Sequence, residues 1–325
     1  MTDYKAPIIF LNIIFGFTVT YLIEKRIIPF LGAKAKQPLY EDGPSWHSIK
    51  NGTPTMGGIA FVLAISLSLI FSSMALYALG MKSESLSLII ALSFCFFNSL
   101  IGIIDDLTKI KRKENEGLSA KQKILLQLVF AVIFIVLRKV CFDDPTVIAL
   151  WGFNYDIGVL YYPLCIILLL GIVNCANLTD GIDGLATSVA FAIGTVILFA
   201  FGENISVGVI SSSFVGATLA FFLFNRNPAK IFMGDTGSLF LGALVVSSAF
   251  SSGLPFYAVP LGVVYVVEGI SVILQVTIFK LTQKRLFKMA PLHHHLEKTG
   301  MKEDQICLCA VIITLLTAII SFIIM

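Results

Sequence analysis

The chain has 325 residues, of which 57% are hydrophobic and only 13% are charged. A soluble globular domain carries about a quarter charged residues, so this composition excludes an ordinary soluble protein and indicates a polytopic membrane protein. The net charge of +3 gives no support to nucleic-acid binding, and the basic residues are available for lipid headgroups or phosphates. The length would allow two domains, but the density of apolar runs predicts a single membrane domain over residues 1–325.

Apolar runs long enough to cross a bilayer follow one another along the chain. A span needs about 20 mostly apolar residues. The segment between Cys141 and Leu160 is too polar for a span and favours a small hairpin at the membrane surface. The expected fold class is therefore all-α, with about ten transmembrane helices. The expected spans are 7–31, 55–79, 86–107, 121–140, 160–177, 185–202, 205–224, 237–253, 255–279 and 305–325.

Basic residues are concentrated on one side of this predicted topology. Ten spans place both termini on one side of the membrane and five loops on the other. Those five loops, with the span ends that flank them, hold 19 of the 23 Lys and Arg residues. Because cytoplasmic loops are enriched in Lys and Arg, the loop side is expected to be cytoplasmic and both termini extracytoplasmic.

The polar motifs all fall on the predicted cytoplasmic side. The first loop carries Glu41-Asp-Gly-Pro-Ser-Trp-His47 and Lys50-Asn-Gly-Thr-Pro-Thr-Met-Gly-Gly58. Four more loops bring Asp, Asn, Lys and His to the same face, a pattern that suits an active site at the boundary between cytosol and membrane. The five candidate regions lie near 32–55, 105–121, 174–184, 225–237 and 283–303.

The third expected span ends in an acidic pair, Asp105 and Asp106. Lys109 follows four and three residues later, so on a helix it is predicted to face both carboxylates and to pair with them. Two adjacent carboxylates can bind Mg²⁺, or they can raise one another's pKa and provide a general base. The alternative is an ordinary charged helix end.

The stretch Asn174-Cys-Ala-Asn-Leu-Thr-Asp-Gly-Ile-Asp-Gly184 separates two apolar runs. Asn174 and Asn177 are one helical turn apart, as are Asp180 and Asp183, so each pair is expected to share a helix face. Polar groups are costly at membrane depth and mark functional sites there, and glycines let another group approach the backbone. The alternative is a short loop followed by a capped helix start.

The two later polar loops contain Phe232-Met-Gly-Asp-Thr-Gly237 and Met289-Ala-Pro-Leu-His-His-His-Leu-Glu297. A lone carboxylate such as Asp235 suits Mg²⁺, which takes one or two protein carboxylates and completes its shell with water and phosphate. Zinc binding by the histidines is disfavoured because no cysteine or second histidine group lies nearby in the sequence. A phosphate-binding or substrate-positioning role is predicted for them, with a solvated polar loop as the alternative.

Together, these motifs resemble those of the polyprenyl-phosphate N-acetylhexosamine-1-phosphate transferases. The resemblance rests on the Asp105-to-Lys109 motif, the Asn174-to-Gly184 stretch, the Asp235 loop and the histidine loop, in matching order from near residue 40 to near residue 300. The Gly52–Gly58 run and the Ala290–His295 run are similar to the branch of the family that uses UDP-N-acetylmuramoyl-pentapeptide.

The resemblance implies a multi-pass enzyme of the bacterial inner (cytoplasmic) membrane whose active site faces the cytoplasm. Such an enzyme requires Mg²⁺ and transfers phospho-N-acetylmuramoyl-pentapeptide from its UDP carrier to undecaprenyl phosphate, giving lipid I and UMP for peptidoglycan synthesis. It also implies ten transmembrane helices with both termini outside, and a homodimer.

The resemblance further implies roles for individual residues. The acidic pair Asp105 and Asp106 would lie near the lipid phosphate, and Asp235 would be the Mg²⁺ ligand. The catalytic set would also include Lys109, His293, His294 and His295. The nucleotide pocket would be lined by Asn174, Asn177, Asp180, Asp183 and Phe232, and the substrate-binding set would also include Gly181 and Asn227. The diphosphate and sugar would be surrounded by Lys50, Thr55, Lys109, Lys113, Lys121, Gln275 and the three histidines.

Two mechanisms and two other functions stay open at this point. Either Asp105 or Asp106 deprotonates the lipid phosphate for direct attack, which is favoured, or a carboxylate first takes the phospho-sugar covalently. A sister enzyme would use UDP-N-acetylglucosamine instead. A secondary transporter would carry its site near the bilayer midplane, often between internal repeats, whereas here the polar groups collect at one face and no convincing repeat is found.

Overall fold

The computed structural model describes residues 5–34, 50, 52–112, 114 and 116–324. It is helical apart from one two-stranded sheet, so the predicted all-α membrane fold is confirmed. The elements in chain order are α1 (Lys5–Lys34), α2 (Gly58–Ala78), α3 (Lys82–Arg112), α4 (Ala120–Phe142), β1 (Val147–Leu150), β2 (Phe153–Asp156), a 3-10 turn (Gly158–Leu160), α5 (Tyr161–Thr179), α6 (Leu185–Phe201), α7 (Ile205–Asn225), α8 (Gly234–Ser251), a second 3-10 turn (Pro255–Tyr257), α9 (Ala258–Leu261), α10 (Val263–Thr282), α11 (Leu292–Lys298) and α12 (Glu303–Ile323).

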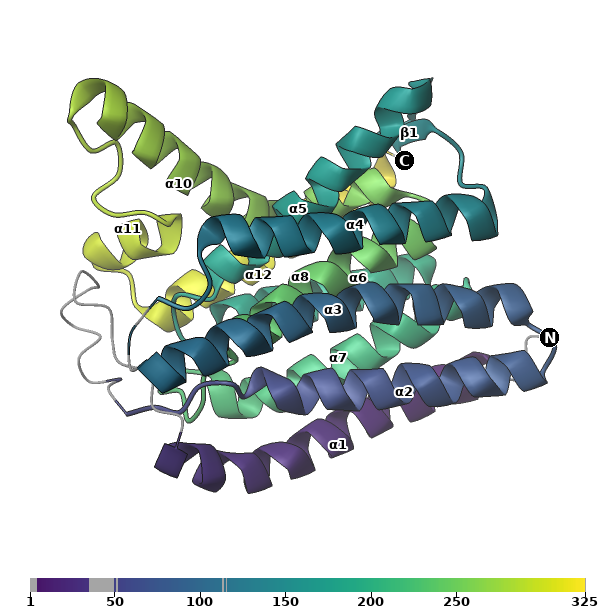
Figure 1. Ribbon diagram of the computed structural model, residues 1–325, viewed down its shortest axis with the longest axis horizontal. Coiled ribbons are helices and arrows are strands. Elements are labelled where there is room, and N and C mark those ends of the chain that lie inside the picture. The colour runs from purple at the N-terminus through teal and green to yellow at the C-terminus, as the bar shows by residue number, and fades with distance from the viewer. Residues whose placement is uncertain (1–4, 35–49, 51, 113, 115, 325) are drawn as a thin grey trace.

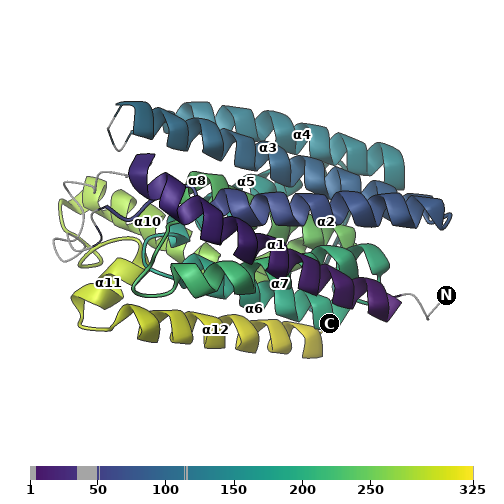
Figure 2. The same cartoon turned by 90° about the horizontal axis from the view of Figure 1, so that it is seen from below.

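The long helices run side by side in one bundle (Figures 1 and 2). In the described part of the chain, eight helices are long and apolar enough to cross a membrane: α1 to α5, α7, α10 and α12. α6 is a shorter apolar helix of 17 residues, and α8 has 18 residues of which most are buried. Nine of these ten helices coincide with expected spans, and α10 overlaps the tenth, while the number that crosses the membrane stays a prediction.

The expected single span 255–279 is wrong, because the chain there is divided into a 3-10 turn, α9 and α10. Pro255 and Pro260 lack the backbone N–H that a continuous helix needs, and Gly262 departs from helical geometry with φ −92° and ψ 25°. After this break α10 tilts away from the other helices and carries α11 with it (Figure 1).

The core of the bundle is formed by α7 and α8, whose side chains are buried on most faces. Small residues let neighbouring backbones approach these helices, as in other membrane helix pairs. A Cβ built on Gly216 of α7 would lie 2.1 Å from the carbonyl oxygen of Ile13 in α1. A Cβ on Gly102 of α3 would lie 2.3 Å from the carbonyl oxygen of Asp235 in α8, so this approach fixes the position of Asp235 against α3.

The hairpin expected between Cys141 and Leu160 is confirmed. β1 and β2 pair antiparallel, from Val147 opposite Asp156 to Leu150 opposite Phe153. The two turn residues, Trp151 and Gly152, both have positive φ, which matches the twist of a two-residue hairpin turn.

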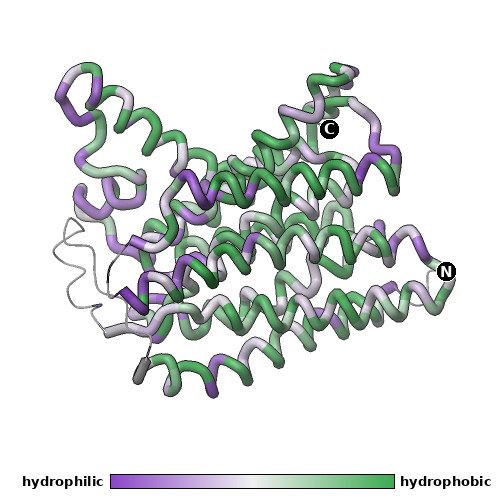
Figure 3. Tube along the Cα trace, viewed as in Figure 1, coloured by the Kyte–Doolittle hydropathy of each residue, from purple (hydrophilic) through white to green (hydrophobic). Residues whose placement is uncertain are grey.

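The two ends of the bundle are more polar than its middle (Figure 3). Apolar residues dominate the middle of the helices, and hydrophilic residues gather at the ends (Figure 3). The start of α1 and the end of α12 lie at one end, while α11 lies at the other (Figure 1). The end beside α11 also holds the polar motifs.

Candidate active site

Three aspartates from two helices meet at the α11 end of the bundle. Asp105 and Asp106 belong to the last third of α3, and Asp235 belongs to the first turn of α8. One carboxylate oxygen from each lies within 4.8 Å of the others. The sequence placed Asp235 in a loop just before a span, whereas the structure places it inside the helix. We call these three residues the acidic cluster.

Two lysines join the acidic cluster. Lys109 Nζ lies 2.7 Å from Asp105 Oδ2 and 3.1 Å from Asp235 Oδ1. Lys123, from the first turns of α4, lies 3.2 Å from Asp105 Oδ1 and 2.8 Å from Asp235 Oδ2. The expected pairing of Lys109 with Asp105 is confirmed. Within the described residues, however, its second ion pair is with Asp235 and not with Asp106.

Asp106 turns instead to the start of α8. Its carboxylate accepts hydrogen bonds from the backbone N–H of Asp235 at 3.1 Å, the N–H of Thr236 at 2.9 Å and the Thr236 hydroxyl at 2.7 Å. These are the N–H groups that a helix start leaves without partners, and a negative charge is favourable there. Asp106 therefore locks α3 to α8 and holds Asp235 in place.

Gly234 makes room for this capping arrangement. It adopts a positive φ of 70°, which a residue with a Cβ adopts only with strain. A Cβ built there would lie 2.5 Å from Asp106 Oδ2 and 3.0 Å from Thr55 Oγ1. Thr55 thus borders the acidic cluster, and its buried hydroxyl has no hydrogen-bond partner among the described residues. The backbone of Phe232 pairs with that of Pro54, at 2.9 Å, and brings the first and fourth polar loops together.

The Asn174–Gly184 stretch is part helix and part loop. α5 ends at Thr179, so the expectation that Asp180 and Asp183 share a helix face is wrong, while Asn174 and Asn177 do lie on α5. Gly184 follows Asp183 with a φ of 78°, which lets the chain turn before α6 begins. Asn174 donates to Gln127 at 2.8 Å and Asn177 donates to Ser238 at 2.7 Å, so their amides tie α5 to α4 and α8.

Asp183 is the centre of an ion-pair network. Its carboxylate accepts from Lys50 Nζ at 2.7 Å and from the backbone N–H of Ala229 at 2.9 Å. Glu303, the first residue of α12, accepts from the N–H of Asp183 at 2.8 Å and lies 2.7 Å from Lys50 Nζ. We call Lys50, Asp183 and Glu303 the bracket. It joins segments that are more than 100 residues apart in the sequence.

Asp180 lies in the same loop, and the charge of the acidic cluster affects the pKa of its carboxyl group. Burial, and after it the negative charges of Asp235, Asp106 and Asp183, raise the pKa of Asp180 to about 8 against the opposing effect of Lys109. This shift favours the neutral form of Asp180, which can donate a hydrogen bond. A cation bound at the cluster would lower this pKa again.

The three histidines occupy different environments in α11. His293 is fully buried. Its backbone nitrogen, which donates a hydrogen bond, and its ring Nδ1 each lie 3.2 Å from the carboxylate of Glu268 in α10. A Cβ built on Gly181 would lie 2.2 Å from His293 Nε2, so this ring packs directly on the α5–α6 loop. Glu268 and His293 thereby position α11 against the Asp180 loop.

His294 and His295 are less buried than His293. His294 Nδ1 lies 2.7 Å from Glu297 Oε2, and His295 Nδ1 accepts from the backbone N–H of Lys288 at 3.1 Å. Gln275 of α10 accepts from the backbone N–H of Phe287 at 2.8 Å, so it holds the loop between α10 and α11.

Some expected site residues lie apart from the acidic cluster. Lys121 and Asn227 are exposed, and neither side chain has a hydrogen bond or ion pair with any other described residue. Lys113 and the Glu41–His47 motif lie outside the described residues. Substrate binding by these groups stays a prediction.

Sequence reasoning missed three residues of the site. Lys123, Glu268 and Glu303 were not named, although Glu268 gave a signal: it is a single carboxylate inside the apolar run 263–279, and ionisable residues at membrane depth mark functional sites. Glu303 and Lys123 gave no comparable signal, because each lies in a polar segment at a helix start.

The acidic cluster has the donor set that a hard divalent cation requires. Mg²⁺ prefers carboxylate oxygens, and the cluster offers three carboxylates against two lysines, which leaves one net negative charge. The Asp235 side chain is 14% exposed, whereas Asp105 and Asp106 are 0% and 1% exposed. Asp235 is therefore the most accessible ligand of the three.

Known proteins share this chain's sequence over nearly its whole length. Residues 87–253 match the model of glycosyl transferase family 4, and residues 50–62 match signature 1 of the phospho-N-acetylmuramoyl-pentapeptide-transferases. The chain is 39% identical over 318 residues to the phospho-N-acetylmuramoyl-pentapeptide-transferase of Halalkalibacterium halodurans, which covers 97% of this chain and 96% of the relative. It is 40% identical over 301 residues to the enzyme of that name from Bacillus subtilis, and the match covers 91% of each chain. It is also 40% identical over 311 residues to the one from Caldanaerobacter subterraneus, and this match covers 94% of this chain and 95% of the relative. The signature and the similarity over nearly the full length show that this chain belongs to the phospho-N-acetylmuramoyl-pentapeptide-transferase family, within glycosyl transferase family 4.

Proposed function

We propose that this protein transfers phospho-N-acetylmuramoyl-pentapeptide from UDP-N-acetylmuramoyl-pentapeptide to undecaprenyl phosphate, releasing UMP and forming lipid I for peptidoglycan synthesis. The observation that carries the proposal is the acidic cluster with its two lysines, at one end of a membrane bundle in a chain of this family. A prenyl chain can stay in the bilayer while its phosphate reaches a site at the helix ends.

The proposed step is a direct displacement at phosphorus. An oxygen of the lipid phosphate attacks the sugar-bearing phosphorus of the diphosphate, and the bond from that phosphorus to the bridging oxygen breaks. UMP leaves with the electron pair. Because the second pKa of a phosphate monoester is about 6, the lipid phosphate is mostly dianionic at pH 7 and needs little help from a general base.

The contacts of Asp105 and Asp106 support this direct route over a covalent intermediate. Both oxygens of Asp105 are engaged, by Lys109, by Lys123 and by the N–H of Leu118 at 2.7 Å. Both oxygens of Asp106 are engaged by the start of α8. A carboxylate nucleophile needs a free oxygen, so we assign the pair to positioning and charge balance.

Lys109 and Lys123 are assigned to the anionic centre of the reaction. Attack of one phosphate on another must overcome charge repulsion, and ammonium groups fixed by Asp105 and Asp235 can offset charge on the departing UMP without reorganising. Fixed geometry then contributes orientation. The Lys109 side chain is 9% exposed and the Lys123 side chain is 21% exposed, so part of each is accessible to a substrate.

Asp235 is assigned as the Mg²⁺ ligand, with Asp105 and Asp106 beside it. When bound, Mg²⁺ supplies positive charge to the diphosphate oxygens and stabilises the leaving phosphate. The fit rests on three hard oxygen donors, one net negative charge and the exposure of Asp235.

The remaining contacts follow from the loops around the cluster. We assign His294 and His295 to the phosphates or the sugar, and His293 to positioning, because its ring is buried against Gly181 and Glu268. We assign Asp180 to the nucleotide pocket, because its loop lies beside the acidic cluster. The other residues assigned to substrate binding are Lys50, Thr55, Lys113, Lys121, Asn174, Asn177, Gly181, Asp183, Asn227, Phe232 and Gln275.

We place this multi-pass protein in the bacterial cytoplasmic membrane, with the acidic cluster facing the cytoplasm and both termini outside. The distribution of basic residues supports this orientation, since 19 of 23 belong to the loop side. A homodimer is proposed from the family resemblance.

A radiolabelled assay with undecaprenyl phosphate and either UDP-N-acetylmuramoyl-pentapeptide or UDP-N-acetylglucosamine tests the proposal. Release of UMP with a labelled lipid, from the muramoyl donor only, is expected. A labelled lipid from UDP-N-acetylglucosamine only would assign the chain to the sister activity. Uptake into sealed vesicles without any lipid product would identify a transporter.

A further inference from the structure

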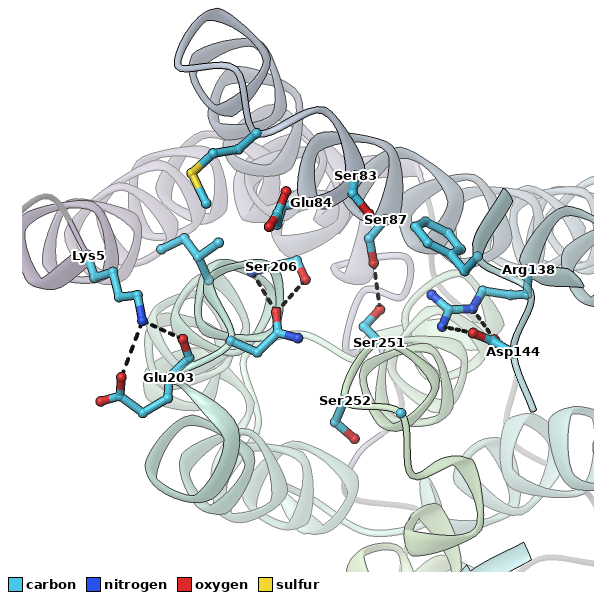
Figure 4. A pocket seen from close by; sticks show the side chains of 15 residues that line it. Lys5, Ser83, Glu84, Ser87, Arg138, Asp144, Glu203, Ser206, Ser251 and Ser252 are labelled. Atoms are coloured by element: carbon cyan, nitrogen blue, oxygen red, sulfur yellow. Dashed lines mark hydrogen bonds and ion pairs between the residues drawn. The ribbon is translucent and has the colours of Figure 1, made fainter. Parts of the chain in front are cut away.

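A polar cavity of about 560 Å³ lies at the end of the bundle opposite the acidic cluster. It is enclosed by the starts of α1, α3 and α7 and by the ends of α4 and α8 (Figure 4). Its volume is within the range of small-molecule sites. Nothing in the proposed transfer reaction uses this end of the molecule.

The charges that line the cavity do not balance. Lys5 donates to the Glu203 carbonyl at 2.7 Å and lies 3.3 Å from its carboxylate, and Arg138 holds Asp144 through two bonds of 2.7 and 2.9 Å. Each cation therefore already has a carboxylate partner. Glu84 is the third carboxylate, and its side chain has no hydrogen bond or ion pair with any residue that the structure describes (Figure 4).

The groups around Glu84 favour a particular kind of cation. Ser87 of α3 donates a hydrogen bond to Ser251 of α8 at 3.4 Å in the lining of the cavity, and hydroxyl oxygens can accept further hydrogen bonds. A single unpaired carboxylate with neutral hydroxyls is too poor in oxygen ligands for Ca²⁺, which takes six to eight. An ammonium group has three N–H donors and one charge, and it matches this set. Met81, Phe142 and Ile205 line the same cavity and can contact a carbon chain.

We propose that this cavity binds a molecule carrying a primary ammonium group, with Glu84 as its counter-ion. Two sources of this chemistry fit: the headgroup of an aminophospholipid, since the cavity lies at the helix ends where headgroups lie, and a free aliphatic diamine. The proposal is independent of the transfer reaction, because no residue of the acidic cluster or the bracket takes part.

Calorimetric titration of the purified full-length protein in detergent tests the proposal. The probes are dihexanoyl-phosphatidylethanolamine, dihexanoyl-phosphatidylcholine, whose quaternary nitrogen has no N–H, and 1,4-diaminobutane. Primary amines are expected to bind at least about tenfold more tightly than phosphatidylcholine, and Glu84→Gln is expected to weaken them by at least about tenfold, because a charge-assisted hydrogen bond is lost. Asp143→Asn is the matched control: it removes the same charge from an exposed residue at the end of α4 that does not line the cavity.

The outcomes separate the two sources. Binding of phosphatidylethanolamine without diaminobutane supports a lipid headgroup, and binding of diaminobutane supports a soluble amine. The proposal is overturned if neither amine binds, if phosphatidylcholine binds equally well, or if Glu84→Gln binds like the parent. Retained UMP release in Glu84→Gln shows that this variant is folded, since Glu84 has no part in the acidic cluster.

Discussion

Replacing Lys123 with methionine removes one of the two cations in the acidic cluster while keeping an unbranched side chain. Three carboxylates would then face Lys109 alone, and the net charge of the cluster would change from −1 to −2. The loss of one preorganised donor to a developing oxyanion costs about 10²–10³-fold in turnover. We therefore expect Lys123→Met to lower the rate of UMP release by about 10²-fold.

The same substitution is expected to strengthen Mg²⁺ binding. A lysine ammonium about 4 Å from a divalent cation repels it by roughly 2 kcal/mol even at the dielectric constant of water. Without that repulsion, the Mg²⁺ concentration for half-maximal turnover should fall by about tenfold or more, although turnover itself is slower. Loss of the fold would not produce this opposite movement of the two quantities.

The assay is UMP release by purified protein across a Mg²⁺ titration at saturating substrates. Lys111→Met is the matched control, because Lys111 lies in the last turn of α3 and is exposed, without an ion pair to the acidic cluster in the described structure. We expect the control to stay within about threefold of the parent. Turnover of Lys123→Met near the parental value, or an equal loss in Lys111→Met, would refute the role assigned to Lys123.

Three further predictions concern other parts of the chain. Asp235→Asn should abolish turnover or raise the Mg²⁺ requirement by tenfold or more, because the amide loses the charge that holds the cation; an unchanged Mg²⁺ titration would move the metal elsewhere. Gly181→Ala should slow turnover by at least about tenfold, since its Cβ would lie 2.2 Å from His293 Nε2, whereas Gly171→Ala, whose Cβ meets nothing within 4 Å, should be near parental in the same assay. A single cysteine at position 284 should resist an impermeant thiol reagent added outside intact cells, and rapid labelling there would reverse the proposed orientation.

Much of the fold could be predicted because membrane helices are recognisable in a sequence as long apolar runs. Nine of the ten expected spans coincide with single helices, and the hairpin follows from the polar segment before α5. The error at 255–279 arose because apolarity alone does not separate a continuous helix from an interrupted one. Pro260 and Gly262 carried the information, since one lacks an N–H and the other lacks a side chain.

The acidic cluster could be predicted in part, because Asp105, Asp106 and Asp235 stood out as charges beside apolar runs. Their partners could not be assigned by the same reasoning. Lys121 and Lys123 are equally polar in the sequence, and only the rotation of α4 against α3 decides which one reaches Asp105. The sequence also does not predict the direction in which a side chain points. Asp105 and Asp106 are neighbours in the sequence, yet Asp105 faces the lysines and Asp106 faces α8.

The bracket has a consequence for how the enzyme is made. Membrane helices are synthesised from the N-terminus, so α3, α4 and α8 can bring the acidic cluster together before the last helix leaves the ribosome. Lys50 and Asp183 meet Glu303 only when α12 begins. A nascent chain that ends before residue 303 would contain the acidic cluster but not the complete bracket, which holds the α5–α6 loop. Completion of the working enzyme is thereby tied to the final stage of translation.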